Sequence, residues 1–257
     1  MKDRMIVVAI LLMPVLCMGQ ADDIESLGFG ADLHGSVGIA YQSQYVWRGF
    51  DVYPDDNSAL QMTANLDFYG TGFGVNVAGH RANRSGFENG ERWDYNLYYA
   101  DVLGEGEPSA THYRVGFVYY SHAQLDSELR DLQEMHAVLS WPGVTGVKGL
   151  VPSYVVVGAW PAHSGSALGE DASGFLHIAM MDFTFASPGD VSGAPEQVFK
   201  LHSEFVFNDG WHPAGALDAS GFRGNVDHDW SHAVLGISMD MDLGFGVTLT
   251  PSVYYQL

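Results

Sequence analysis

The sequence has few basic residues and only one cysteine. It contains 11 Lys and Arg residues against 31 Asp and Glu residues, and its formal net charge is −20. A charge of this sign repels phosphate groups, so we expect no nucleic acid partner. Cys17 is the only cysteine, so no disulfide can form within one chain. The fold must therefore be stabilised by burial and sheet pairing.

The sequence also lacks an apolar run long enough to cross a bilayer as a helix. An apolar stretch at residues 5–16 follows Lys2 and Arg4 and is followed by Cys17-Met18-Gly19. This order is typical of an export signal, so we predict a signal peptide over residues 1–19 and a single domain over residues 20–257. Lipidation of Cys17 is an alternative that we disfavour, because Leu16 stands where a small residue normally precedes the lipidated cysteine.

Charged residues make up 16% of the chain and aromatic residues 13%, unlike the charge-rich composition of a disordered chain. Residues 34–50 show the clearest pattern, because apolar and polar side chains alternate there. Side chains of a strand point alternately to its two faces, so the pattern predicts one long strand with an apolar and a polar face. The apolar row is Val37, Ile39, Tyr41, Tyr45 and Trp47. Aromatic residues at its end are typical of a membrane-spanning strand where it leaves the bilayer.

The same alternation recurs along the chain and predicts about eleven strands, with no helix long enough to cover a sheet. Residues 150–160 are apolar on both parities, so the sequence does not show which face of that strand is buried. Residues 125–132 could hold one helical turn. The connections alternate in length. Residues 70–72, 142–149 and 244–246 are short, whereas residues 50–57, 81–92, 161–172 and 209–230 are long. Short turns on one side and long loops on the other are typical of outer-membrane barrels.

We therefore predict an all-β fold, a transmembrane antiparallel up-and-down β-barrel of about 12 strands. Bacterial single-chain barrels have an even number of strands, so we expect a closing strand after Leu257. A secreted β-sandwich also alternates apolar and polar residues. Long strands, aromatic residues near strand ends and alternating loop lengths favour the barrel.

The pentapeptide Tyr45-Val46-Trp47-Arg48-Gly49 at the end of the first predicted strand resembles the TorF-type porin family of largely uncharacterised outer-membrane barrels. The likeness continues through residues 60–69, 93–99 and 113–120. The resemblance implies an outer-membrane barrel with a passive transport role. It implies no catalytic residues and no particular substrate.

The polar parity of the predicted strands supplies candidate pore-lining residues. Inside a barrel, charged side chains must be hydrated or paired, so this set either lines an open lumen or fills it with ion pairs. Arg48 could pair with Asp67 or Asp94, or form a basic constriction, and we favour the structural pair. The candidate residues are Gln42, Gln44, Arg48, Asp67, Asp94, Asn96, Arg114, Glu134, Lys200, Glu204, Asp240 and Asp242.

We predict no catalytic residues, no cofactor and no metal site. His202-Ser203-Glu204 cannot form a catalytic triad within one strand, because adjacent side chains point to opposite faces. Asp229, Ser231 and His232 are hardly better placed. Two acidic segments, Asp55-Asp56-Asn57 and Asp227-His228-Asp229 with His232, offer ligands for a divalent cation. They lack the spacing of a calcium loop, so we interpret them as solvated loops.

Together these patterns predict a porin-like channel of the bacterial outer membrane for small polar solutes or ions, with a preference for cations. Its expected partners are outer-membrane lipids and those solutes. The alternatives are a non-conducting structural or adhesive barrel and, less favoured, a lipid-modifying barrel enzyme.

Overall fold

The computed structural model describes residues 4–14, 32–54, 57–164, 166, 172–187, 197–212 and 228–257. Strands dominate these residues, and the two helical segments are single turns. The elements in chain order are β1 (Arg4–Pro14), β2 (Asp32–Gln42), β3 (Val46–Trp47), β4 (Phe50–Asp51), β5 (Ala59–Tyr69), β6 (Phe73–Ala82), η1 (Glu88–Gly90), β7 (Arg92–Leu103), β8 (Thr111–Ser121), α1 (Ser127–Arg130), β9 (Leu132–Ser140), β10 (Leu150–Pro161), β11 (Gly174–Ser187), β12 (Gln197–Asp209), β13 (His228–Gly244) and β14 (Val247–Gln256).

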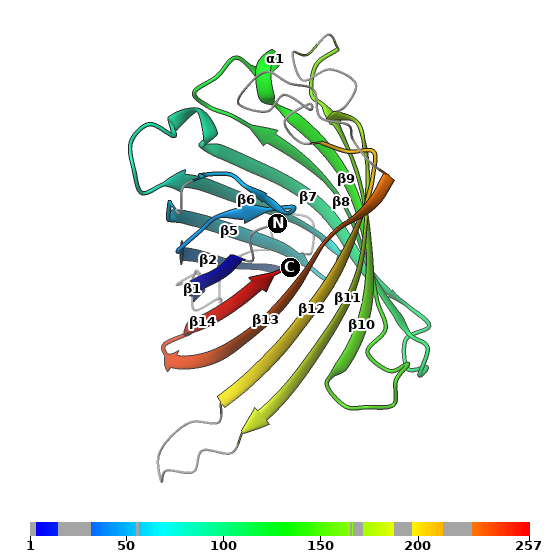
Figure 1. Cartoon of the computed structure of the whole chain (residues 1–257). Coiled ribbons are helices and arrows are strands. Elements are labelled where there is room, and N and C mark those ends of the chain that lie inside the picture. Colours follow the sequence, from blue (N-terminus) through cyan, green and yellow to red (C-terminus); the bar gives the residue numbers. More distant parts are fainter. Residues whose placement is uncertain are drawn as a thin grey trace.

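Consecutive long strands from β2 to β14 pair with one another in antiparallel fashion and form one strongly curved sheet (Figure 1). The all-β, antiparallel, up-and-down prediction is thus confirmed. Within the described residues, no pairing joins β2 directly to β14, so the sheet of residues 32–257 is not closed on itself. Instead β1 pairs antiparallel with both edges, and Val8 lies opposite Gln42 of β2 and Ser252 of β14. The segment predicted to be a signal peptide thus lies between the two edges of the sheet.

The alternation of side chains determines which residues lie on the convex face of the sheet and which lie on its concave face. On β13, Leu235 and Ile237 are 47% and 43% exposed on the convex face. Polar residues of the opposite parity face inward, because the side-chain period of a strand is two residues. Across the ladder Leu235 lies opposite Tyr255, and Ile237 lies opposite Val253. The outward apolar rows therefore continue from strand to strand, and they include Tyr41, Tyr95 and Phe117.

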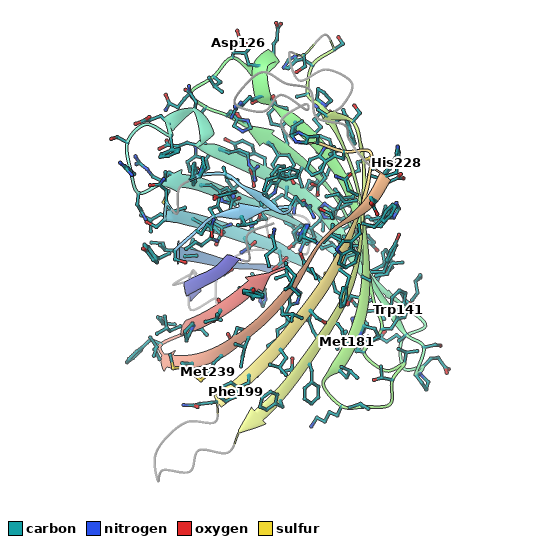
Figure 2. All side chains as sticks on the ribbon, in the orientation of Figure 1. Asp126, Trp141, Met181, Phe199, His228 and Met239 are labelled. Atoms are coloured by element: carbon teal, nitrogen blue, oxygen red, sulfur yellow. The ribbon has the colours of Figure 1, made fainter. Side chains whose placement is uncertain are left out.

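Successive connections lie at opposite ends of the sheet, but their lengths alternate only in part, because residues 141–149 at the short-turn end are as numerous as residues 83–91 at the long-loop end. Figure 2 shows Asp126 and His228 at the long-loop end, and Phe199 and Met239 at the short-turn end. The predicted helical turn is present as α1 in a long loop, with the Asp126 side chain accepting a hydrogen bond from the backbone nitrogen of Glu128. No helix of the described residues is both long and apolar enough to cross a membrane.

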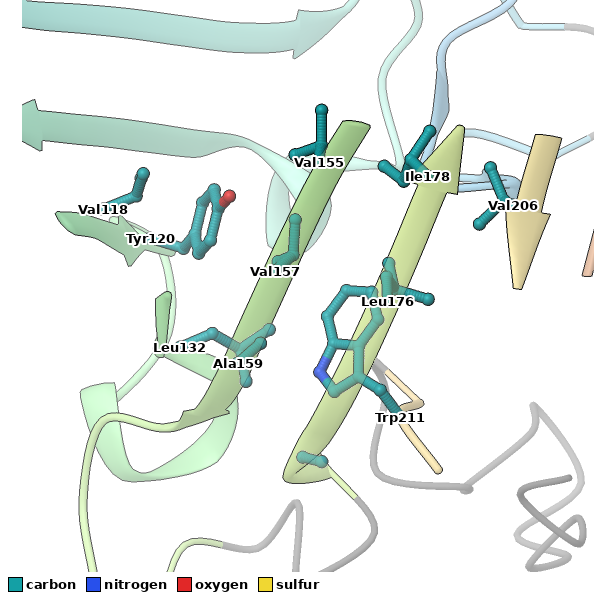
Figure 3. Close-up of a cluster of buried hydrophobic side chains, with 11 residues drawn as sticks. Val118, Tyr120, Leu132, Val155, Val157, Ala159, Leu176, Ile178, Val206 and Trp211 are labelled. Atoms are coloured by element: carbon teal, nitrogen blue, oxygen red, sulfur yellow. The ribbon is translucent and has the colours of Figure 1, made fainter. Parts of the chain in front are cut away.

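On β10, whose face the sequence left open, the side chains of alternate residues are buried on the concave side of the sheet. Val155, Val157 and Ala159 are buried, and Val157 lies opposite Leu176 of β11. These residues belong to an apolar cluster on the concave side of the sheet, which Trp211 covers (Figure 3). The inward face is therefore not polar throughout, because aliphatic side chains occupy it on β10, β11 and part of β12.

The prediction of one strand over residues 34–50 is wrong after Gln42. The chain bends at Ser43, where the alternation of the sequence is also interrupted, and β3 and β4 form a separate small hairpin. Tyr45 is only 6% exposed. It therefore does not continue the outward aromatic row that the sequence predicted.

If the outward face meets lipid, Leu235→Arg should lower the free energy of unfolding in vesicles by about 2–4 kcal/mol, because the charge would then enter hydrocarbon. Ser238→Arg, on the inward face of the same strand, is the matched control and should have a smaller effect. Denaturant titrations of protein refolded into vesicles measure both. Equal stability of Leu235→Arg and wild type would show that the outward face does not meet lipid.

Candidate functional site: an inner hairpin and two polar hollows

The β3–β4 hairpin, together with its flanking residues 43–53, is called the inner hairpin here. Its two strands are joined by Arg48 and Gly49, whose φ angles are 52° and 87°. Positive φ at both residues of a two-residue loop is what a type I′ turn requires, and this turn matches the twist of the flanking strands. Trp47 pairs with Phe50 across the turn, and the Gln44 amide donates a 2.7 Å hydrogen bond to Asp51. Local sequence therefore forms the hairpin.

Contacts with widely separated strands place the inner hairpin on the concave side of the sheet. The Arg48 guanidinium reaches Glu134 on β9, whereas the Gly49 carbonyl accepts a hydrogen bond from the side chain of Gln256 on β14. A Cβ atom at Gly49 would lie 2.7 Å from the imidazole of His232 on β13. The hairpin thus extends across the inside of the curved sheet, and Gly49 permits the close approach.

Arg48 forms a paired, mostly buried contact with Glu134. One terminal nitrogen of Arg48 lies 2.9 and 3.0 Å from the two carboxylate oxygens, and the Glu134 side chain is only 1% exposed. Tyr120 donates a 2.6 Å hydrogen bond to the same carboxylate, and His136 lies 3.1 Å from it. Burial acts to lower the pKa of Arg48, but the Glu134 charge, together with the contacts to Tyr120 and the hydrogen bonds to Glu134, raises that pKa above its ordinary value. Arg48 therefore stays charged, with its charge neutralised locally.

A second charged network lies beside the first. The Arg92 guanidinium donates hydrogen bonds of 2.6 and 2.9 Å to Asp94, and His80 lies 3.0 Å from the same carboxylate. Tyr45 of the inner hairpin joins this network, because its hydroxyl accepts a 3.3 Å hydrogen bond from Arg92. Burial raises the pKa of Tyr45 well above its ordinary value, so the hydroxyl keeps its proton. The hairpin is thereby held to β6 and β7.

Trp47 connects the charged networks to the apolar cluster. Its ring meets the rings of Tyr120 and Trp211 edge to face, with centroids 5.1 and 5.5 Å apart. The Arg92 guanidinium lies 4.0 Å from the centre of the Trp47 ring, a cation–π contact. Trp47 therefore anchors the inner hairpin on its apolar side.

Two polar hollows lie on either side of the inner hairpin, and Trp47 and Arg48 line both. The first, the β5–β10 hollow, measures about 490 Å³. The second, the β11–β14 hollow, measures about 440 Å³ and also touches β2. Both are large enough for a small polar solute and several water molecules.

The predicted pore-lining residues all lie on the concave side, but the two hollows divide them. Asp94, Asn96, Arg114 and Glu134 line the β5–β10 hollow with Arg48. Gln42, Gln44 and Glu204 line the β11–β14 hollow with the same arginine. Lys200, Asp67, Asp240 and Asp242 are among the lining residues of neither. Arg48 pairs with Glu134 and not with Asp67 or Asp94, the two partners that its sequence position suggested.

Residues outside both hollows form local contacts. Lys200 lies 3.1 Å from Asp182 on β11, an inward carboxylate that sequence reasoning missed. Asp240 accepts a 2.6 Å hydrogen bond from Thr250. Asp242 accepts one of 2.8 Å from the backbone nitrogen of Gly244 at the short turn. Arg92 was also missed, because its position at the end of a polar segment suggested a loop rather than the first residue of β7.

The catalytic and metal alternatives can be compared with the geometry. Ser203 donates to the carbonyl of Met181, while His202 lies 2.7 Å from Asp182. Ser231 lies 2.9 Å from His232, whose other ring nitrogen is 3.8 Å from Glu204, too far for a hydrogen bond. Among the described residues, no group of three or more His, Cys, Asp or Glu side chains is arranged to hold a metal ion. Asp55, Asp56 and Asp227 lie outside the described residues.

Three comparisons with known proteins found no match to this chain. No family model matches the chain, and neither the curated proteins nor the solved structures contain a significant match.

Proposed function

We propose that the protein is a porin-like channel of the bacterial outer membrane, through which small polar solutes and ions diffuse past the inner hairpin. The observation that carries this proposal is the pair of polar hollows beside the hairpin, on the concave side of a sheet whose convex side is apolar. A pore needs hydrated or paired polar side chains inside and apolar side chains outside. The two faces of this sheet meet those needs, and the resemblance of residues 45–49 to TorF-type porins agrees with them.

Membrane insertion of a closed barrel is part of the proposal. It is supported by exposed apolar side chains on successive strands, among them Ile39, Leu97, Val115 and Phe205. A soluble protein rarely exposes apolar surface of this extent, whereas lipid would cover it. A closed ring also leaves no unpaired strand edge in lipid. β1 pairs with both edges of the sheet here, but it lies within the predicted signal peptide, so the mature barrel would need another strand in that place.

Cation preference follows from which inward charges are neutralised. Arg48, Arg92 and Lys200 each lie against a carboxylate. Within the described residues, no salt bridge to Arg, Lys or His neutralises Asp67, Asp240 or Asp242, so these carboxylates keep their field in the lumen. Glu204 is not counted with them, because its carboxylate lies 3.5 Å from His202. Only Arg114 is an unpaired arginine or lysine among the residues that line the two hollows.

We expect the refolded protein to conduct in planar bilayers and to favour K⁺ over Cl⁻ in a KCl gradient. The preference should weaken as salt rises, because charges at the mouth are screened over about 8–10 Å at physiological ionic strength. Reversal potentials measure it. Arg48→Gln is the control for the contribution of arginine, since it removes the one arginine that borders both hollows. An anion preference in wild type would contradict the charge argument.

The second candidate function is a non-conducting barrel with a structural or adhesive role. The apolar cluster favours it, because Trp47 and Trp211 pack against Tyr120, Val157 and Leu176 on the concave side. Such packing would fill part of the bore. Absence of conductance from correctly folded wild type would decide in favour of this candidate.

A further inference from the structure

Arg114 on β8 differs from the other arginines on the concave side. Among the described residues, its guanidinium makes no hydrogen bond and no ion pair, and its Nε atom is buried without a partner. A buried donor without a partner is costly and rare in native proteins. Arg114 lines the β5–β10 hollow, so a molecule in that hollow can reach the terminal nitrogens of its guanidinium, while Nε itself is buried.

The guanidinium is held in place by an aromatic ring rather than by a carboxylate. It lies 3.7 Å from the centre of the Tyr98 ring, and the Tyr98 hydroxyl donates a hydrogen bond to Asp67. Gly74 makes this layer possible, because a Cβ atom there would lie 2.3 Å from the Tyr98 hydroxyl. Stacking fixes the plane of the guanidinium and leaves its hydrogen-bond donors unused.

A free acceptor lies in the same hollow. The Oδ1 atom of Asn96 is buried and has no hydrogen-bond partner. A Cβ atom at Gly116 would lie 3.1 Å from this oxygen and 2.5 Å from Nε2 of His136, so glycine allows both side chains to pack against β8. The hollow thus offers an unused guanidinium and an unused amide oxygen.

We infer that the β5–β10 hollow binds the carboxylate group of a small solute, with Arg114 as its ligand. A planar guanidinium matches a carboxylate with two parallel hydrogen bonds. Asn96 Oδ1 would accept a hydrogen bond from a hydroxyl or amino group of the same solute. Asp94 and Glu134 line the hollow and Asp67 lies behind Tyr98, so a single negative charge is favoured over two. The solute reaches the site only through an accessible lumen, which is where the inference rests on the proposed function.

The opposite hollow provides the internal contrast. The β11–β14 hollow is lined by Glu204, and its one arginine is Arg48, which Glu134 neutralises. It therefore contains no free cation of the Arg or Lys type among its lining residues. Carboxylate binding is expected on the Arg114 side only.

The test uses the full chain refolded in detergent micelles and sodium acetate as the carboxylate probe at pH 7. We expect a saturable shift of the Arg114 Nε–Hε NMR resonance with acetate, and no saturation with sodium chloride. Arg114→Lys assigns that resonance by its disappearance. Saturation-transfer signals of the acetate methyl group should be lost in Arg114→Gln and kept in Lys200→Gln, which removes the same charge elsewhere on the concave side.

Acetate signals that persist in Arg114→Gln would overturn the inference, as would tighter binding of phosphate dianion than of acetate. Circular dichroism checks that each variant is folded. The outcome is separable from the channel proposal, because binding is measured without a membrane. Acetate binding by a protein that does not conduct would support the carboxylate site and contradict the channel proposal. Conduction without acetate binding would support the channel proposal and contradict the carboxylate site.

Discussion

Replacing Glu134 with alanine should lower the free energy of unfolding by about 3–5 kcal/mol, because it leaves the Arg48 guanidinium without its carboxylate in a mostly buried position. The same change removes the acceptor of the Tyr120 hydroxyl. We also expect the inner hairpin to leave its place between the hollows, so that conductance rises. Denaturant titration in vesicles gives the stability, and planar bilayers give the conductance.

Two controls separate the lost charge from the lost side chain. Glu134→Gln keeps the shape of the side chain and removes its charge, so most of the destabilisation should remain. The double variant Arg48→Met with Glu134→Met removes both charges and should be more stable than Glu134→Ala, since no charge is left unpaired. If Glu134→Ala unfolds at the same denaturant concentration as wild type, the pair does not hold the hairpin.

Trp47→Ala should destabilise the protein by about 3–5 kcal/mol, the usual cost of removing a well-packed tryptophan side chain. The change removes the edge-to-face contacts with Tyr120 and Trp211 and the cation–π contact with Arg92. Since Trp47 borders both hollows, its loss should also join them and raise the conductance. Denaturant titration in vesicles measures the stability, and planar bilayers measure the conductance.

Trp230→Ala is the matched control for Trp47→Ala. Trp230 is 52% exposed on the outward face of β13, where its ring lies 5.9 Å from that of Phe205. Its removal should cost less and leave the conductance unchanged. A larger effect at Trp230 than at Trp47 would show that tryptophan size, rather than the position of the hairpin, sets the result.

Strand period was the most reliable guide to the fold. On β13, the alternation of Leu235 and Ile237 with Ser238 and Asp240 is enough to predict both a strand and its apolar face, because a one-residue change of register would reverse every side chain. On β10 the same reasoning failed. Both parities of residues 150–160 are apolar, and only the neighbouring Leu176 and Ile178 show which parity lies against the apolar cluster.

The first predicted strand shows a different limit. The alternation is interrupted only at Ser43 and resumes at Tyr45 and Trp47, so one polar residue was too weak a signal to predict the bend there. Arg48-Gly49 did contain a signal, since a residue followed by glycine between short apolar segments suits a two-residue hairpin loop. The partner of Arg48 could not be predicted from this signal. Glu134 is distant in sequence, and several inward carboxylates satisfied the same parity rule.

The inner hairpin also sets an order on folding. Its turn forms from neighbouring residues, but its anchors come much later in the chain, since Gly49 bonds Gln256 across 207 positions and Arg48 meets Glu134 across 86. Loop-closure entropy makes such contacts slow to form. The hairpin can therefore form early but dock fully only after β14 has joined the sheet. Docking of the inner hairpin is then a late step, which shows that the last strand is in place. Until it occurs, the hairpin does not fill the space on the concave side of the sheet.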